Sequence, residues 1–164
     1  PMSRIHSLKV MVELFLCLVD AVCGQTPAHR DMPEDYFARI LPKWLGKYTG
    51  TVVFTYGDIA DKKGGEGFPA NLVFYPYKDV IVFELKTYHT PFSYFFFLPP
   101  STFTPSAIEF MRNAVHLGTE YQFKVALSFS GSELNGTMRM YSLISNGSYT
   151  PRGAYFMSFK KQEP

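Results

Sequence analysis

The sequence predicts a mainly β protein: a single antiparallel meander β-barrel of about seven or eight strands with one or two short helices. The clearest observation is alternation at 121–130, where large apolar residues take the odd positions and mostly polar residues the even ones. A second is the aromatic content of 17%, which favours strands because aromatic side chains pack well on a pleated surface. A two-sheet β-sandwich is the alternative, since it also protects strand edges.

Composition places the chain among globular proteins. Hydrophobic residues make up 46% of the 164 residues and charged residues 18%, which suits one domain with a real core. The formal net charge is +2, and no dense run of Lys and Arg provides a surface for phosphates. We therefore expect no nucleic-acid partner.

The first 24 residues differ from the rest. Basic residues precede an apolar stretch at 10–22, a pattern typical of a secretory signal peptide. Glu13 and Asp20 interrupt that stretch, so an amphipathic helix docked on the domain is the alternative. Both cysteines lie in this segment, and cleavage would remove them. We expect a signal peptide at 1–24 and a secreted or periplasmic protein of the cell envelope.

Residues 25–42 are expected to form a linker and a short helix. Asp31 would cap the helix at 33–41, and Pro42 would end it because proline lacks the backbone N–H that a helix needs. The barrel domain then occupies 43–164.

Alternation and turn residues predict the strands of the first half. They are expected at 47–56, 71–75, 80–88 and 92–98. The second and third of these form a hairpin through 76–79, and a polar loop at 57–67 follows the first.

The strand at 92–98 is apolar on both faces except at Ser93, so its second face needs a cover. We expect that cover to be a helix at 105–117, because Thr104 and Pro105 resemble a helix start and apolar residues recur at helical spacing. The competing interpretation is a strand through Ile108, Phe110 and Arg112. A partner chain or lipid is the alternative cover.

The second half continues as a meander. Strands are expected at 121–130, 133–143 and 149–160, with Gly- and Asn-bearing turns at 130–132, Asn135-Gly136 and Asn146-Gly147. Both Asn-Gly pairs also match the N-glycosylation pattern. Turn chemistry is the preferred interpretation, and whether Asn135 and Asn146 carry glycans is left open.

A short helix, the run Lys-Trp-Leu-Gly-Lys-Tyr at 43–48 and the meander together resemble the lipocalin and fatty-acid-binding group, the calycin-like barrels. In that group a Gly and an aromatic residue close the barrel bottom. The family order is Gly-x-Trp, whereas here Trp44 precedes Gly46 and Tyr48 takes the Trp place. The resemblance implies a central pocket for an apolar ligand.

Inward parity selects the residues that would line such a pocket. The candidates are Tyr121, Phe123, Leu127, Met138, Met140 and Tyr155. Flexible Met and aromatic walls suit a small apolar or aromatic molecule, and plain core packing is the alternative.

Residues that could carry out catalysis or hold a metal are sparse. No His has a second His or Cys at ligand spacing, and no nucleophile motif or paired carboxylates are present. We expect no catalytic residues, metal or cofactor. The leading hypothesis is therefore an exported, non-enzymatic, lipocalin-like binding protein. The alternatives are a structural or interaction protein that contacts a protein or its own copy through 92–98, and a small barrel isomerase or cyclase.

Overall fold

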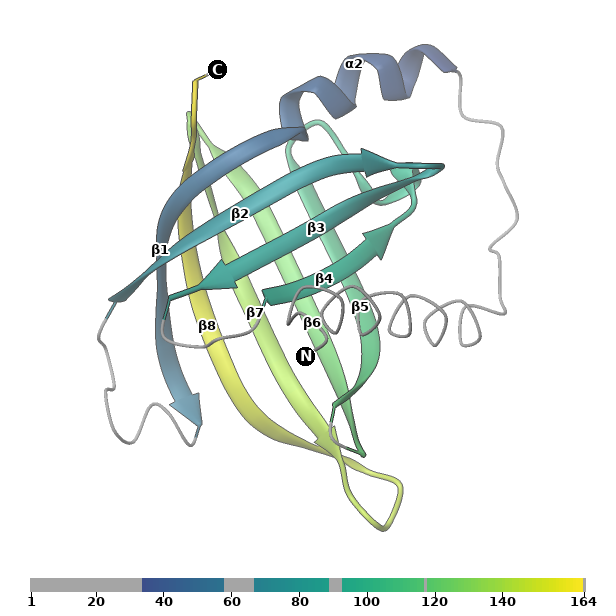
Figure 1. The fold of residues 1–164 in the computed structure, drawn as a ribbon, viewed down its shortest axis with the longest axis vertical. Helices are drawn as coiled ribbons and strands as arrows, with labels where there is room; N and C mark the ends of the chain where they lie inside the picture. The colour runs from purple at the N-terminus through teal and green to yellow at the C-terminus, as the bar shows by residue number, and fades with distance from the viewer. Residues whose placement is uncertain (1–33, 58–66, 89–92, 117, 164) are drawn as a thin grey trace, which may run out of the picture. The chain divides into compact units, whose positions relative to one another are not determined.

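The computed structural model describes residues 34–57, 67–88, 93–116 and 118–163. These residues form one α-helix, one short 3-10 helix and eight strands (Figure 1). In chain order the elements are α2 (Glu34–Trp44), β1 (Gly46–Gly57), β2 (Gly67–Tyr77), β3 (Val80–Thr87), β4 (Ser93–Leu98), η1 (Pro100–Thr102), β5 (Ala107–His116), β6 (Thr119–Ser130), β7 (Glu133–Leu143) and β8 (Tyr149–Lys161). No helix in these ranges is long and apolar enough to cross a membrane.

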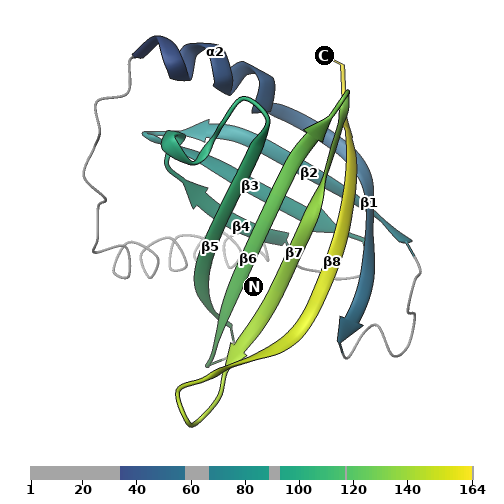
Figure 2. The ribbon, with the colours of Figure 1, turned by 180° about the vertical axis from the view of Figure 1, so that it is seen from behind.

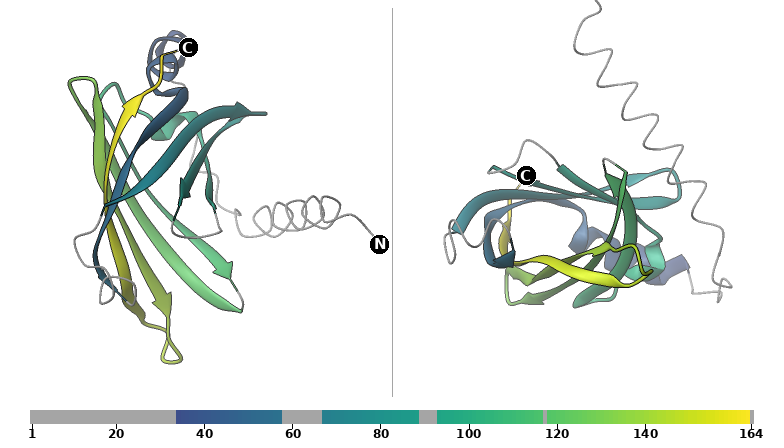
Figure 3. Two further views of the ribbon diagram at one scale, coloured as in Figure 1. Left: turned by 60° about the vertical axis from the view of Figure 1, so that its left-hand side comes forward. Right: turned by 90° about the horizontal axis from the view of Figure 1, so that it is seen from below.

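The eight strands form one antiparallel sheet that is nearly closed into a barrel. Its order is β4-β3-β2-β1-β8-β7-β6-β5, so consecutive strands pair except β4 with β5, and β1 also pairs with β8. The strands β2 to β4 lie across the layer made by β5 to β8, and the bent strand β1 belongs to both (Figures 1 and 2). Seen from the side, the two layers face each other (Figure 3). The predicted fold class, a mainly β, single antiparallel meander barrel with a short helix, is confirmed.

The barrel is closed between β4 and β5 by side chains instead of a hydrogen-bonded ladder. These two strands are the ends of the sheet order, and each keeps one edge without a partner strand among the described residues. The Phe110 ring of β5 lies 5.4 Å from that of Phe96 on β4 and 5.6 Å from that of Phe83 on β3, measured between centroids. Aromatic packing therefore bridges the seam.

The helix α2 runs further than the sequence predicted. Pro42 lies inside it, and the helix ends at Trp44 instead of before the proline. An interior proline costs a helix about 3 kcal/mol, so tertiary contacts must offset it. They do so through Trp44, which is fully buried, and through Tyr48 and Lys161, whose side chains donate hydrogen bonds to the last carbonyls of the helix. The expected capping residue, Asp31, lies outside the described residues.

The predicted helix at 105–117 is wrong, because Ala107–His116 within it form the strand β5. Ile108 and Phe110 are buried, whereas Met111 and Val115, which the helical pattern counted as core, are 51% and 58% exposed. Pairing with β6 along the whole segment decides for the strand. The capping signal was real but serves a turn: the Thr104 hydroxyl accepts a hydrogen bond from the Ala107 N–H at 3.0 Å.

The outer face of β4 is consequently not covered by a helix at 105–117. Tyr94, Phe96 and Leu98 share the inward parity, and Phe96 and Leu98 are buried. Phe95 points the other way and is 41% exposed. One apolar face of β4 therefore lines the barrel, and the other lies on the barrel surface.

The remaining strands follow the predicted positions, with one turn misplaced. Asn135-Gly136 is not a turn but lies inside β7, where Gly136 pairs with Leu127. The β6–β7 turn is at Gly131 and Ser132, within the turn predicted at 130–132. The Asn146-Gly147 turn is confirmed by hydrogen bonds between Ile144 and the residues at 147 and 148, and by the positive φ of Gly147, +82°.

The position of Gly136 within β7 leaves no room for a side chain, and this leads to a stability prediction. A Cβ at this position would collide with the carbonyl oxygen of Ala126 on β6. Gly136→Ala should therefore lower the free energy of unfolding by about 1–3 kcal/mol, measured by chemical denaturation. Gly67→Ala is the matched control, because a Cβ there meets its nearest neighbour at 3.7 Å. Equal stability of the two variants would contradict the close approach of β6 and β7.

Candidate functional site

The two ends of the barrel are built differently. In an antiparallel meander the odd-numbered strands run one way and the even-numbered strands return, so strand ends alternate between two ends of the barrel. We call the end at which α2 leads into β1 the helix end. The other, where β1, β3, β5 and β7 finish, is the far end (Figure 1).

Trp44 seals the helix end. Its ring centroid lies 5.7 Å from Phe74, 5.6 Å from Phe103 and 4.6 Å from Phe129, and the side chain has no exposed surface. Its indole N–H donates a hydrogen bond of 2.7 Å to the carbonyl oxygen of Thr104. Its polar atom is thus satisfied, as burial of an indole requires.

Aromatic contacts continue from this seal through the interior. Centroid distances are 5.5 Å from Phe74 to Phe83, 5.5 Å from Phe83 to Phe96 and 5.3 Å from Phe96 to Phe123. Tyr94 lies 5.8 Å beyond Phe123. Along this line the barrel is filled by side chains in contact, which is the packing arrangement that the sequence left open.

At the far end, apolar side chains are only partly buried. They share the inward parity of their strands and pack against the buried core, and we call them the far-end cluster: Phe68, Tyr94, Ala114, Tyr121 and Met140. Half-buried apolar side chains at one end, opposite a sealed end, provide a surface that an apolar ligand would cover.

A pair of tyrosine hydroxyls lies beside this cluster. The Tyr94 and Tyr155 oxygens are 2.9 Å apart, and the Phe54 ring packs 4.4 Å from the ring of Tyr155. Burial raises the pKa of both tyrosines above the ordinary value of 10.0, and for Tyr155 the neighbouring Tyr94 adds to this effect. Both hydroxyls therefore stay neutral at physiological pH and can take part in hydrogen bonds with a polar group of a ligand.

Two arginines lie near the far end. Arg112 is at an inward-parity position of β5, opposite Phe123, and its guanidinium donates a hydrogen bond of 2.8 Å to the carbonyl oxygen of Met111. Arg152 lies at the irregularity between β7 and β8 and donates through Nε to the hydroxyl of buried Ser142 at 2.6 Å. Neither contact neutralises the positive charge, so both add positive potential to this end.

The structure brings most of the predicted ligand residues together. Tyr121 and Met140 belong to the far-end cluster, and Phe123 and Tyr155, 7% and 5% exposed, lie beneath it. Met138 pairs with Tyr155 and is buried one step deeper. Leu127 lies apart from them, opposite Gly136 in the buried core. Whether any of them contacts a ligand stays a prediction.

Sequence reasoning missed three members of the cluster. Tyr94 was assigned to an interaction strand and Ala114 to a helix. Phe68 was placed next to the polar loop, whereas it is the second residue of β2. The competing interpretation, a strand through Ile108 and Phe110, would have placed Ala114 on the same inward face as these two residues.

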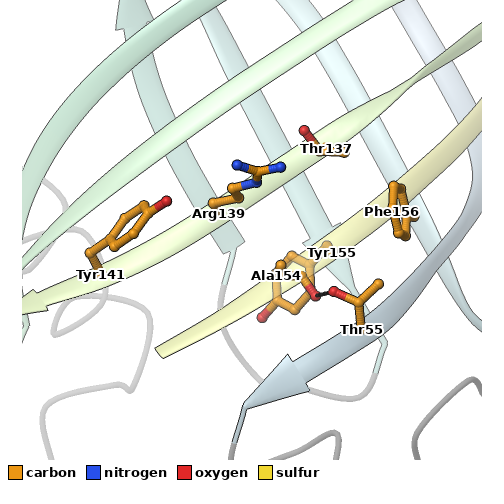
Figure 4. A pocket seen from close by; sticks show the side chains of 7 residues that line it. All are labelled: Thr55, Thr137, Arg139, Tyr141, Ala154, Tyr155 and Phe156. Atoms are coloured by element: carbon orange, nitrogen blue, oxygen red, sulfur yellow. Dashed lines mark hydrogen bonds between the residues drawn. The ribbon is translucent and has the colours of Figure 1, made fainter. Parts of the chain in front are cut away.

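Two surface hollows lie outside the far-end cluster. One, of about 210 Å³, is formed on the outward side of β1, β7 and β8 (Figure 4). The other, of about 340 Å³, is lined by Lys47, Asn71, Glu84 and Lys86 among others, on β1 to β3. Within the described ranges no three His, Cys, Asp or Glu residues gather where they could hold a metal ion.

No family model and no curated protein sequence matches the chain. Among solved structures it is similar to a secretary abundant heat soluble (SAHS) protein from Ramazzottius varieornatus, with a TM-score of 0.38 and 11% identity. The match covers 73% of this chain and 96% of that chain.

The buried tyrosines predict a loss of stability at alkaline pH. Burial raises the pKa of Tyr48 to about 12, and those of Tyr94 and Tyr155 are also raised, whereas in the unfolded chain tyrosines ionise near pH 10. Stability present below pH 10 is therefore lost as the pH rises above it. Each tyrosine that ionises only when unfolded contributes a slope of about 1.4 kcal/mol per pH unit.

The double variant Tyr94→Phe with Tyr155→Phe should show a shallower decline of the unfolding free energy between about pH 10 and 12. Urea denaturation at a series of pH values measures both slopes. Tyr77→Phe, at an exposed position, is the control and should keep the wild-type slope. Identical slopes for the double variant and the wild type would show that the hydroxyl pair is not buried as described.

Proposed function

We propose that this protein is an exported, non-catalytic binding protein that takes a small apolar or aromatic molecule at the far end of its barrel. The observation that carries the proposal is the far-end cluster, five partly buried apolar side chains at the end opposite fully buried Trp44; near Trp44 itself Leu41, Leu45 and Phe129 are also partly buried. Covering apolar surface contributes about 25 cal/mol for each Å². A ligand seated on the cluster would gain this without opening the sealed end.

Movable side chains would make room for such a ligand. Met140 is unbranched and flexible, and it lies opposite Phe123, where the packed interior ends toward the far end of the barrel. The Tyr94–Tyr155 hydroxyl pair offers hydrogen bonds to one polar group of the ligand. The positive charges of Arg112 and Arg152 favour a molecule with a negatively charged end, although the apolar contacts carry the binding.

No catalytic role is proposed, because the buried side chains of the described residues include no carboxylate and no histidine. An isomerase or cyclase that transfers a proton through a carboxylate or a histidine would need that group next to the tyrosine pair.

A matched pair of methionine substitutions tests the binding end. Met140 belongs to the far-end cluster, whereas Met111 is 51% exposed on the outward side of β5. Met140→Trp should fill the site and weaken binding of the neutral fluorophore N-phenyl-1-naphthylamine at least about tenfold, equivalent to about 1.4 kcal/mol. Met111→Trp should leave the dissociation constant unchanged, as measured by fluorescence titration. Equal affinity of both variants and the wild type for N-phenyl-1-naphthylamine would contradict the assignment of the binding site to the far end.

The edge strand β4 supports a second candidate function, contact with a protein partner or a second copy through the segment 92–98, of which Phe92 lies outside the described residues. Exposed edge strands are normally protected by charge or proline, and Ser93–Leu98 contains neither. Phe95 adds an exposed ring to this unpaired edge.

Substitution at Phe95 tests this candidate. If β4 forms an interface between copies, Phe95→Asp should convert an oligomer to a monomer in sedimentation velocity, because a charge would be buried there. Tyr77→Asp is the control, since Tyr77 is 44% exposed and Phe95 41%. A wild-type protein that stays monomeric at high concentration would count against contact between copies.

A further inference from the structure

Two positive side chains face each other on the outward side of the barrel. Lys124 on β6 and Arg139 on β7 are directly opposite in the register, and both are exposed. Like charges at directly opposite positions of neighbouring strands repel and lower stability. The pair therefore costs the folded protein free energy unless something neutralises it.

The described residues provide no such neutralisation. The Lys124 Nζ lies 5.2 Å from the centroid of the Tyr141 ring, and Arg139 has no hydrogen bond or ion pair within the described ranges. The acidic side chains of β5 and β6 on the same side of the sheet either have other hydrogen-bond partners or lie at other register positions. Glu120 accepts hydrogen bonds from Tyr149 and Asn113, and Glu109 is opposite Ala126 instead of Lys124.

Arg139 also lines the hollow of about 210 Å³ on this wall. Tyr141 and Thr137 line it from the same strand, Phe156 from β8 and Thr55 from β1 (Figure 4). Along β7, Arg139 lies between Tyr141 and Thr137, with Phe156 beyond Thr137 in this view. Phe156, opposite Thr137 in the register, is 57% exposed and adds a large apolar surface to the same hollow.

We propose that this hollow binds a small organic anion that carries a flat apolar group. The guanidinium of Arg139 suits a phosphate, sulfate or carboxylate, because its planar donors match two oxygens at once. Lys124 adds a second positive charge, and the flat group would lie against Phe156 or Tyr141. Binding of the anion would remove the repulsion between the two cations.

The size of the hollow and the surrounding charge limit the ligand to a small molecule. Drug-sized ligands occupy pockets of about 300–1,000 Å³, so the smaller hollow fits a single ring with one anionic group. Glu109 and Glu120 lie on the same face of the sheet, so the positive charge does not extend into a stripe that would follow a polyanion.

Isothermal titration with phenyl phosphate tests the site on the full chain. We expect Arg139→Gln to weaken binding at least about tenfold, the loss of a charge-assisted contact. The matched control is Arg39→Gln on the exposed side of α2, which removes the same charge elsewhere and should leave the affinity unchanged. Phe156→Ala should weaken phenyl phosphate several-fold but leave the weaker binding of inorganic phosphate as it was.

A stability measurement separates a binding role from a structural one. Without ligand, Arg139→Gln should unfold at the same or a higher denaturant concentration than the wild type, because repulsion from Lys124 is gone. Phenyl phosphate should stabilise the wild type and Arg39→Gln, and should stabilise Arg139→Gln much less. Undiminished binding by Arg139→Gln, an equal loss in Arg39→Gln, or phenyl phosphate binding no tighter than inorganic phosphate would each overturn the proposal. Neutral N-phenyl-1-naphthylamine reports the far end and should bind Arg139→Gln normally, so the two sites are tested separately.

Discussion

The burial of Trp44 holds the fold together at one end of the barrel. The indole N–H binds the carbonyl oxygen of Thr104 before β5, and Tyr48 of β1 and Lys161 of β8 bind the last carbonyls of α2. Helix, first strand, last strand and the link to β5 thus meet around one side chain. The far-end cluster lies at the opposite end of the barrel.

Side-chain parity separates two chemical environments on the same strands. On β7, Met140 belongs to the apolar far-end cluster, whereas Arg139 and Tyr141 on either side of it line the hollow on the outer wall. The two environments differ in charge and lie on opposite faces of one sheet. Tyr155 lines the hollow and also belongs to the tyrosine pair at the far end, so the variants Met140→Trp and Arg139→Gln are needed to test the two proposals separately.

Alternation predicted the strands well because it reports burial on one face, which local sequence expresses directly. It failed where tertiary contacts decide: Thr104 and Pro105 give a helix-start signal, yet pairing with β6 makes the next segment a strand. Tyr121 and Met140 could be placed by parity alone. Tyr94 could not, because its contact with Tyr155 depends on how the two layers cross. The pairing of Lys124 with Arg139 follows only once the turn is placed at Gly131 and Ser132.

We propose that the far end admits an apolar ligand and that the helix end does not. NMR tests this most directly, on the full chain labelled with ¹³C-methyl methionine and ¹⁵N-tryptophan. The labelled protein is titrated with neutral N-phenyl-1-naphthylamine. We expect the largest shift at the methyl of Met140, a smaller one at Met138, and none at exposed Met111 or at the indole N–H of Trp44, the single tryptophan. A large shift at Trp44 or Met111 with Met140 unchanged would contradict it.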